Sequence, residues 1–324
     1  MKQAFAYAFS IALLAATLAA PAGAQQAYPT RPIRLFVPAA AGSSTDAPAR
    51  MLAESLKASL GQPVVVDNRA GAAGMLGVMT AVRAPADGYN LLFTSSSAAV
   101  NQALNKSGEF DMRRDLVPIA IVAHGILGLF VHPSLPVKTP ADLVAYAKAR
   151  PGQLNYGSGG IGSTNHLLTE QLKSLVGIDI VHVPYAVTQT LVMDATTNQV
   201  QLLMQDVGYM RPQVAVGRLR MIGVATQKPS VLAPDTPTIG GHDGIPSFEG
   251  SFFFGVFAPA GTPAPIVETL YRHVEAWAQA PATRRKLVEM GYEPALENPD
   301  AARKAVAAYV ERFTKIVERA GITK

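Results

Sequence analysis

The sequence predicts an α/β fold of two domains, built from strand–helix–strand units. Apolar runs of strand length alternate with amphipathic helical patterns along the chain, as in 33–37 followed by 47–60. Such alternation is typical of parallel strands linked by helices. The 324 residues are 49% hydrophobic and 16% charged, so the chain can form two substantial cores and does not have the composition of a disordered protein.

The first part of the chain predicts three strands and three helices. Strands are expected at 33–37, 64–66 and 91–93, and helices at 47–60, 71–83 and 98–104. A long apolar run follows at 118–131, interrupted by Gly125 and Gly128. Its length predicts either two strands or one strand that continues from one domain into the other.

The second part repeats this alternation. Thr139 and Pro140 supply a capping residue and a first-turn proline for a helix. Strands are then expected at 154–156, 178–184, 200–204, 219–225 and 252–258, with helices at 165–176 and 190–197 and three more after Pro263. We expect the chain to cross between domains near 122–131 and 252–258. The expected domains are 25–123 plus 250–324, and 124–249.

The amino terminus has the pattern of a signal peptide. Lys2 precedes an apolar run at 4–20, and Ala22-Gly23-Ala24 fits a small-x-small cleavage site. We expect residues 1–24 to be removed after Ala24 and the protein to be soluble in a bacterial periplasm, with an uncleaved anchor as the alternative. The chain has no cysteine, which excludes disulfides, a cysteine nucleophile and cysteine metal sites.

Two strand-to-helix loops are rich in small and hydroxyl residues. The first covers 39–46 and the second covers 157–164. Such a loop presents backbone N–H groups and hydroxyls at the positive end of a helix dipole, which makes an anion site without a cationic side chain. Two such loops predict a ligand with an anionic group, held between two domains.

The second loop also matches the dinucleotide-binding pattern G-x-G-x-x-G at 157–162. A dinucleotide fold normally has this unit early in its domain, with an acid at the end of the next strand, whereas here Asp179 begins that strand. We therefore favour a small-anion loop. His166, in the first turn of the following helix, is a possible ligand contact, although a structural role is favoured. His182, on the next strand, is interpreted as structural.

Other functional classes lack their motifs. The sequence has no G-x-S-x-G elbow, no P-loop lysine and no H-E-x-x-H, and its histidines have no metal-ligand spacing. The net charge is +5, but Lys and Arg are scattered, so nucleic-acid binding is not expected. We expect no enzymatic activity, no catalytic residue, no metal and no cofactor.

Four polar residues near strand ends have two interpretations each. Asp46 is either a ligand contact or a first-turn acid of its helix. Asp206 follows a strand and either accepts a hydrogen bond from a ligand or fixes a loop. Tyr185 and Tyr209 either wall a pocket or pack in the core.

A series of ordered segments resembles one known family. These segments are Tyr28-Pro29-Thr30-Arg31-Pro32-Ile33-Arg34, Gly42-Ser43-Ser44-Thr45-Asp46, Gly61-Gln62-Pro63 with 64–69, Ala86-Asp87-Gly88-Tyr89, 154–158, 181–185 and 258–263. Their order over 28–322 resembles the Bug/TctC family of extracytoplasmic solute receptors, which serve tripartite tricarboxylate transporters.

The resemblance implies a type II periplasmic binding protein whose two domains close on a ligand in the cleft between them. It implies a small carboxylate ligand, either a di- or tricarboxylate or an aromatic acid. The implied partners are the membrane subunits of a tripartite tricarboxylate transporter or, alternatively, a sensor kinase, and we expect a monomer. The implied ligand-binding residues are Gly42, Ser43, Ser44, Thr45, Asp46, Thr94, Ser95, Ser158, Gly159, Gly162, Ser163, Thr164 and Asp206, with Tyr185 as a candidate pocket wall.

The chain departs from the family pattern around these loops. Residues 39–41 are all alanine where an aromatic residue and prolines are usual, and 186–188 replace a Lys-Gly-Gly. Met204 and Gln205 precede Asp206 where an aromatic residue is usual. The small alanines predict room for a bulkier acid, such as an aromatic carboxylate.

Overall fold

The computed structural model describes residues 28–105, 108–241, 245 and 248–320. The fold below is that of the described residues from Arg31 onward. The expected signal peptide, 1–24, and its cleavage site lie outside the described residues.

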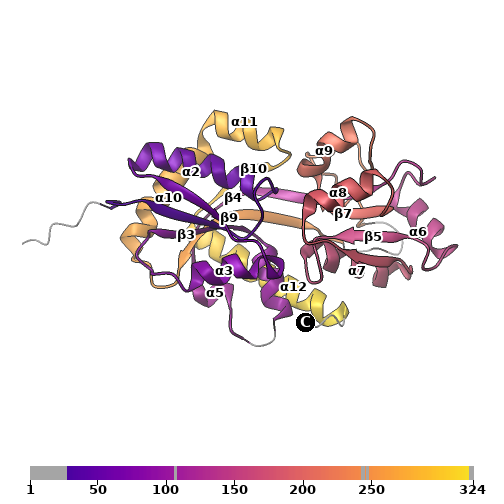
Figure 1. Ribbon diagram of the computed structural model, residues 1–324, viewed down its shortest axis with the longest axis horizontal. Helices are drawn as coiled ribbons and strands as arrows, with labels where there is room; N and C mark the ends of the chain where they lie inside the picture. The colour runs from indigo at the N-terminus through magenta and orange to yellow at the C-terminus, as the bar shows by residue number, and fades with distance from the viewer. Residues whose placement is uncertain (1–27, 106–107, 242–244, 246–247, 321–324) are drawn as a thin grey trace, which may run out of the picture. The chain divides into compact units, whose positions relative to one another are not determined.

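The strands form one sheet in the order β2-β1-β3-β9-β4-β7-β5-β6, with β10 and β8 also paired to β4 (Figure 1). Their bounds are β1 (Ile33–Val37), β2 (Val64–Asn68), β3 (Asn90–Ser95), β4 (Leu116–Val131), β5 (Asn155–Ser158), β6 (Val181–Pro184), β7 (Leu202–Asp206), β8 (Arg220–Val224), β9 (Ser251–Pro259) and β10 (Glu293–Glu297). The α/β prediction is therefore confirmed.

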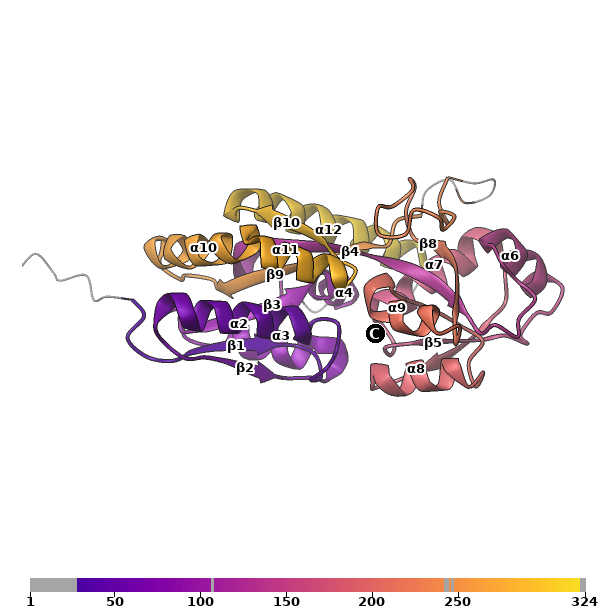
Figure 2. The ribbon, with the colours of Figure 1, turned by 90° about the horizontal axis from the view of Figure 1, so that it is seen from above.

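Helices follow most strands. Their bounds are α2 (Asp46–Leu60), η1 (Ala72–Gly74), α3 (Met75–Val82), α4 (Ser97–Leu104), α5 (Met112–Asp115), α6 (Pro140–Lys148), α7 (Thr164–Val176), α8 (Thr188–Thr196), α9 (Val207–Ala215), α10 (Ala264–Gln279), α11 (Pro281–Glu289) and α12 (Pro299–Ala320). The helix α12 packs on α4, β4 and α7 and so contacts both halves of the sheet (Figure 2).

The long apolar run at 118–131 forms one strand, β4, and not two separate strands. Its first half pairs with β9 and β10, and its second half pairs with β7 and β8. The strand β9 runs antiparallel beside β4, with His124 opposite Phe253 and Ile126 opposite Ser251. The strands β4 and β9 therefore lie side by side in the middle of the sheet and include the segments 122–131 and 252–258.

Only the outer strands are parallel. The pairs β1–β2, β1–β3, β5–β6 and β5–β7 are parallel, whereas every pair made by β4 or β9 is antiparallel. The expectation of mostly parallel sheets is wrong for the centre, because the chain runs out along β4 and returns along β9. Buried aromatic rings lie along this part of the sheet, with Phe253, Phe254 and Phe257 on β9 and Phe93 on the neighbouring β3.

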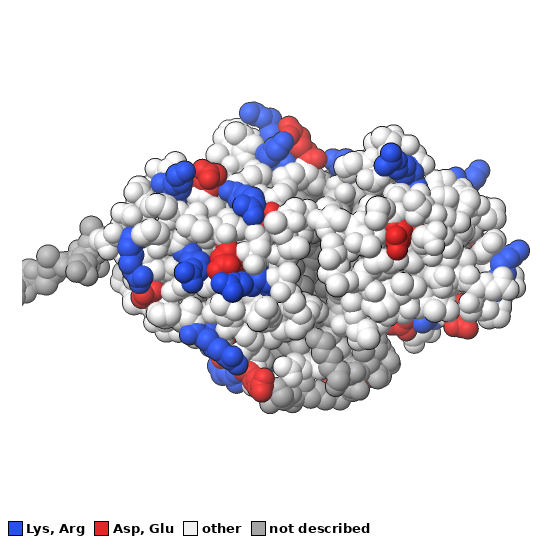
Figure 3. Space-filling view, viewed as in Figure 1, with Lys and Arg blue, Asp and Glu red and all other residues white. Residues whose placement is uncertain are grey.

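Three elements were not predicted. The strand β10 and the helix α5 are short, and α9 contains Gly208 and Pro212, which disfavour a helix in isolation. In the part of the chain that the structure describes, no helix combines the length and apolar character needed to cross a bilayer. Charged side chains are dispersed over the visible surface and form no stripe (Figure 3).

Candidate functional site

A cavity of about 200 Å³ lies where several helices begin. The N-cap residues Thr45 of α2, Ser96 of α4, Ser163 of α7 and Asp206 of α9 all line it. The complete lining is Ala39, Ser43, Ser44, Thr45, Ser95, Ser96, Ser97, Leu127, Gly159, Ser163, Thr164, Asn165, Thr188, Gln205, Asp206, Phe252 and Phe254. The lining therefore combines hydroxyl groups and helix N-termini with the rings of Phe252 and Phe254.

The first loop is held from behind by Asp46. Its carboxylate accepts hydrogen bonds from the Gly42 N–H at 2.8 Å, the Arg50 Nε at 2.8 Å and the Asn68 Nδ2 at 2.9 Å. Burial raises the pKa of Asp46, but the hydrogen bonds from these donors and the charge of Arg50 lower it by more than burial raises it. The pKa of Asp46 is therefore below its usual value. Asp46 is buried and does not line the cavity, so its structural interpretation fits its contacts.

This arrangement leaves backbone donors of the first loop open. Thr45 is the N-cap of α2, but its side chain makes no capping hydrogen bond. Among the described residues, the N–H groups of Ser44 and Thr45 have no hydrogen-bond acceptor. Because they lie at the positive end of a 15-residue helix, they favour an anion in the cavity.

The loop between β3 and α4 contributes a third helix start. Ser95 Oγ donates to Ser97 Oγ at 2.9 Å and accepts from the Ser97 N–H at 3.3 Å. Ser96 is fully buried, and its Oγ has no partner among the described residues. A buried hydroxyl without a partner costs free energy, and Ser96 is one of the residues that line the cavity. Thr94 is buried behind this loop.

The second loop is held in place by α7. The Ser163 side chain accepts from the His166 N–H at the start of the helix, and its hydroxyl donates to the Gly160 carbonyl at 2.7 Å. The Gly159 N–H donates to Asn165 Oδ1 at 3.3 Å. Gly159, Ser163, Thr164 and Asn165 line the cavity, and the N-terminus of α7 points at the same space.

Two histidines lie under this loop. Ser158 Oγ is 2.6 Å from His182 Nε2, and the Gly162 N–H donates to His166 Nδ1 at 3.2 Å. The two imidazole rings are 4.2 Å apart between centroids. Burial lowers the pKa of His166, and burial together with the neighbouring His166 lowers the pKa of His182 to about 4. Both rings are therefore neutral at neutral pH and support the loop, which agrees with the structural interpretation.

Asp206 is fixed by three donors. It accepts from the N–H groups of Gly208 at 2.8 Å and Tyr209 at 3.4 Å, and from the Tyr292 hydroxyl at 2.8 Å. Burial raises the pKa of Asp206 to about 7, and these three hydrogen bonds lower it only in part. Asp206 fixes the start of α9 through these hydrogen bonds and also lines the cavity. Its position therefore agrees with both predicted roles, a residue that fixes a loop and a hydrogen-bond acceptor for a ligand.

A second, wider chamber of about 620 Å³ adjoins the first. The two share Ala39, Ser43, Gly159 and Thr188. The other residues of this outer chamber are Pro38, Ala40, Ala70, Gly71, Ala72, Ala73, Gly74, Gly160, Ile161, Pro184, Tyr185, Ala186, Val187 and Gln189. Tyr185 thus lies beside the inner cavity, in the outer wall.

The structure brings most of the predicted site residues together. Ser43, Ser44, Thr45, Ser95, Gly159, Ser163, Thr164 and Asp206 line the inner cavity, whereas Gly42, Asp46, Thr94, Ser158 and Gly162 lie outside its lining. The sequence did not lead us to predict the polar lining residues Ser96, Ser97, Asn165, Thr188 and Gln205, or the apolar ones Leu127, Phe252 and Phe254. The Ser95–Ser97 triplet before a helical pattern was the available signal for a third loop.

Neither chamber contains a cationic side chain. All lining residues are described, and Lys, Arg and His are absent from both sets. Across the described residues, no three His, Asp or Glu side chains gather in a way that could hold a metal ion. An anion in the inner cavity would therefore be held by N–H groups and hydroxyls.

Comparison with known proteins gives consistent matches. The profile of the family described as "Tripartite tricarboxylate transporter family receptor" matches residues 48–322. Protein BugT of Bordetella pertussis is 36% identical over 313 residues, which are 96% of this chain and 95% of BugT. The solved structure of R. palustris Rpa4515 with adipate has a TM-score of 0.84 and 34% identity, and the match covers 91% of this chain and 99% of that chain. MatC from Rhodopseudomonas palustris with bound malate has a TM-score of 0.81 and 26% identity, covering 90% and 100%.

Proposed function

Because this chain belongs to the family of tripartite tricarboxylate transporter receptors, we propose that it captures a small carboxylate in the periplasm and delivers it to the membrane subunits of such a transporter. The chain is a receptor and not an enzyme. The ligand carboxylate occupies the inner cavity, and residues 1–24 are a signal peptide that is cleaved after Ala24 during export. The protein acts as a monomer.

The observation that carries this proposal is the buried Ser96 hydroxyl among the open helix N-termini. Ser96 Oγ has no partner among the described residues, and the N–H groups of Ser44 and Thr45 have no acceptor there. A carboxylate is the ligand that satisfies several converging donors at once, and each charge-assisted hydrogen bond contributes roughly 1.5–3 kcal/mol. The adipate and malate bound to two similar proteins support the same ligand class.

Two domains close around this ligand. We assign 25–123 plus 250–324 to one domain and 124–249 to the other, with β4 and β9 as the strands that flex between them. The cavity lining supports this division, because Ser43 and Ser96 come from the first domain and Ser163 and Gln205 from the second. Closure would remove the carboxylate from water and strengthen its hydrogen bonds.

The test is the substitution Ser96→Ala. It removes the unpartnered hydroxyl, so we expect carboxylate affinity to fall by about tenfold while stability without ligand stays unchanged or rises slightly. Ser59→Ala, at an exposed position on α2, is the control. Titration calorimetry with malate, adipate and benzoate measures affinity, and thermal unfolding measures stability. If a carboxylate binds and Ser96→Ala leaves its affinity unchanged, the assigned cavity is wrong.

A further inference from the structure

Asp206 is the only acidic side chain in the lining of the inner cavity, all of which the structure describes. No other residue of this described lining is Lys, Arg, His, Glu or Tyr, so Asp206 is the one group there that titrates between about pH 3 and pH 9. In the view of Figure 3, the hollow at the middle of the face contains no atoms coloured as charged. A carboxylate that enters the cavity therefore meets another carboxyl group and no cationic side chain.

The small size of the cavity brings these two carboxyl groups close together. A cavity of about 200 Å³ has a width of roughly 7 Å if it is spherical, which is below the Debye length of about 8 Å at physiological ionic strength. At an effective dielectric constant of about 20, two like charges about 6 Å apart repel strongly enough to change an equilibrium by about a hundredfold. Binding a carboxylate beside an ionised Asp206 is therefore disfavoured compared with binding it beside a protonated one.

The hydrogen-bond donors to Asp206 are all neutral. Its Oδ1 accepts from the N–H groups of Gly208 at 2.8 Å and Tyr209 at 3.4 Å, and its Oδ2 accepts from the Tyr292 hydroxyl at 2.8 Å. Burial raises the pKa of Asp206 to about 7, and these hydrogen bonds lower it only in part. The carboxyl group is thus about half protonated near neutral pH, where a nearby negative charge readily adds a proton to it.

The groups that face Asp206 supply no compensating positive charge. The titratable side chains beside it are Tyr209 and Tyr292, and burial raises the pKa of both, so they stay neutral. Arg211, on the same helix α9, donates instead to two backbone carbonyl groups of other segments. Glu293, which follows Tyr292, is exposed.

The charged groups of the two neighbouring loops are also engaged. Behind the first loop, Asp46 accepts from Arg50 at 2.8 Å. Under the second loop, burial lowers the pKa of His166 and His182, so both rings are neutral above pH 7. Asp206 is therefore the group whose charge responds when a carboxylate enters the cavity near neutral pH.

We infer that the receptor captures a carboxylate together with one proton, which Asp206 takes up from the solvent. This inference rests on the proposed function, since it assumes that the carboxylate occupies the inner cavity. N–H groups and hydroxyls can hold one carboxylate there, but two carboxyl groups that share a buried site do not both ionise without cost. Asp206 receives the proton because it is a weaker acid than a small carboxylic acid that comes from water.

The hydrogen bonds around Tyr292 accommodate this proton. When Asp206 is ionised, the Tyr292 hydroxyl donates to its Oδ2 at 2.8 Å. When Oδ2 carries a proton, it donates to the Tyr292 oxygen, and the hydroxyl turns to the Ser44 carbonyl oxygen, which is 3.4 Å away. Oδ1 keeps both of its N–H donors, so the cap of α9 stays intact while Asp206 loses its charge.

Titration calorimetry of the unaltered protein with malate, adipate and benzoate tests the inference. Each acid is titrated at pH 6.5 and 8.5, and at pH 7.5 in HEPES and in Tris, which differ in their enthalpy of ionisation. At pH 6.5 the free protein is already largely protonated at Asp206, whereas at pH 8.5 each binding event must add the proton. We therefore expect affinity to fall by at least about tenfold from pH 6.5 to pH 8.5, with about 0.5–1 proton taken up per bound acid at pH 7.5.

The substitution Asp206→Asn should abolish both effects. The amide keeps an oxygen for the N–H groups of Gly208 and Tyr209 and places a neutral N–H group beside Tyr292, as the protonated acid does. We expect no proton uptake and, at pH 8.5, an affinity about tenfold higher than that of the unaltered protein. Asp179→Asn removes the same charge at an exposed position that lines neither chamber, so it is the matched control and should behave as the unaltered protein does.

The outcomes separate this inference from the proposed function. Binding without proton uptake, at an affinity that is constant from pH 6.5 to pH 8.5, would overturn the inference and leave the carboxylate receptor intact. Asp206 would then be an ionised hydrogen-bond acceptor. Proton uptake that persists in Asp206→Asn would overturn it as well, because another group would receive the proton. Failure of malate, adipate and benzoate all to bind would overturn both.

Discussion

The hydroxyl of Tyr292 donates to the carboxylate of Asp206 at 2.8 Å, although the two residues are 86 positions apart. Tyr292 precedes β10 and Asp206 ends β7, so this hydrogen bond joins opposite halves of the sheet beside the cavity. The same hydroxyl lies 3.4 Å from the Ser44 carbonyl in the first loop. Both side chains are buried, so this hydrogen bond is shielded from water and holds the two segments together.

Replacing Tyr292 with phenylalanine removes this donor and keeps the ring. We expect a loss of about 1–3 kcal/mol in the free energy of unfolding, because the buried Asp206 carboxylate loses one of its three donors. Urea unfolding measures the effect. The control is Tyr271→Phe, which removes a hydroxyl bonded to Glu275 on the partly exposed face of α10 and should change stability by less than about 1 kcal/mol. Equal decreases in the free energy of unfolding for Tyr292→Phe and Tyr271→Phe would show that the hydrogen bond to Asp206 contributes no more to stability than an exposed one.

The stability of the protein should depend on the ionisation of Asp206. Its pKa is raised by burial from 3.8 to about 7. Between these values the folded state holds a proton that the unfolded state has released, so this group makes stability fall as pH rises through that window. Asp206→Asn keeps an oxygen for capping α9 and removes the titration. We expect the stability of the variant relative to the unaltered protein to increase by on the order of 2–4 kcal/mol between pH 4 and pH 8. A difference that stays constant over this range would contradict the raised pKa.

Local signals explain which parts of the fold the sequence could predict. The strands β1 and β5 and the helices after them have apolar runs, glycine-rich loops and amphipathic patterns within a few residues of each other. The strand β10 has no such signal, since Glu293, Pro294 and Glu297 form no apolar alternation. Its strand conformation comes from pairing with β4, with an irregular register between Pro294 and Glu297. A tertiary partner therefore creates an element that local propensity does not favour.

The residues of the candidate site likewise fall into two groups, those that local sequence could predict and those that only tertiary pairing brings to the cavity. The two glycine-rich and hydroxyl-rich loops could be identified because each one is contiguous in sequence. The convergence of Ser96 on the same cavity depends on the pairing of β3 with β9, and the contact of Tyr292 depends on the turn before β10. Long-range pairing of this kind leaves no local pattern. For Asp46, the sequence could not show that Arg50 and Asn68 would draw the carboxylate away from the cavity.

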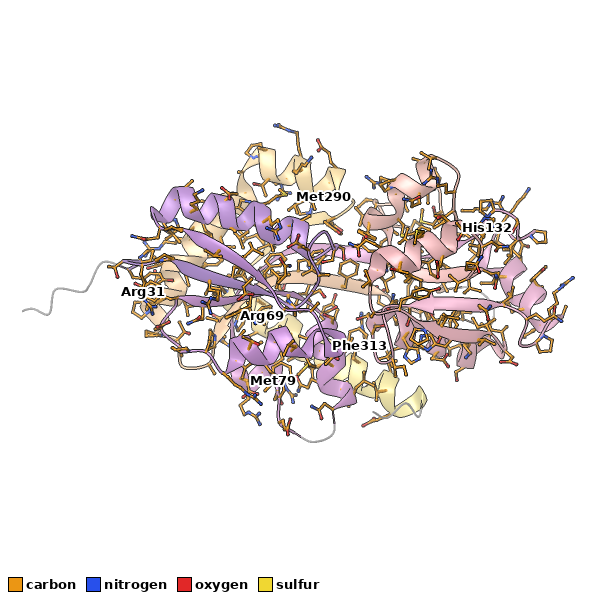
Figure 4. The ribbon with its side chains drawn as sticks, in the orientation of Figure 1. Arg31, Arg69, Met79, His132, Met290 and Phe313 are labelled. Atoms are coloured by element: carbon orange, nitrogen blue, oxygen red, sulfur yellow. The ribbon has the colours of Figure 1, made fainter. Side chains whose placement is uncertain are left out.

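Gly208 and Gly291 allow two backbones to meet next to this contact. A Cβ at Gly208 would lie 1.9 Å from the Met290 carbonyl oxygen, at the end of α11 (Figure 4). We expect Gly208→Ala to destabilise the protein by at least about 2 kcal/mol, because backbone atoms must move apart. Gly217→Ala is the control, since Gly217 has open space around it but a φ of +70°. It should cost only the roughly 1–2 kcal/mol of left-handed strain. A smaller loss for Gly208→Ala than for Gly217→Ala in urea unfolding would show that the close approach is not maintained in solution.

The histidine pair under the second loop should make the protein sensitive to acid. Burial and the neighbouring His166 lower the pKa of His182 from 6.5 to about 4, so the unfolded state binds a proton in this window and the folded state does not. Stability from this group is therefore complete above pH 6.5 and is lost as pH falls towards 4, by on the order of 2–3 kcal/mol.

The substitution His182→Gln tests this loss, because it keeps an acceptor for Ser158 and removes the titration. It should flatten the dependence of unfolding free energy on pH between 6.5 and 4, even if it lowers stability at neutral pH by about 1 kcal/mol. His132→Gln, beyond the end of β4, is the matched histidine-to-glutamine exchange outside the pair (Figure 4). Parallel curves for His182→Gln and the unaltered protein would mean that protonation of this ring does not weaken the support of the loop.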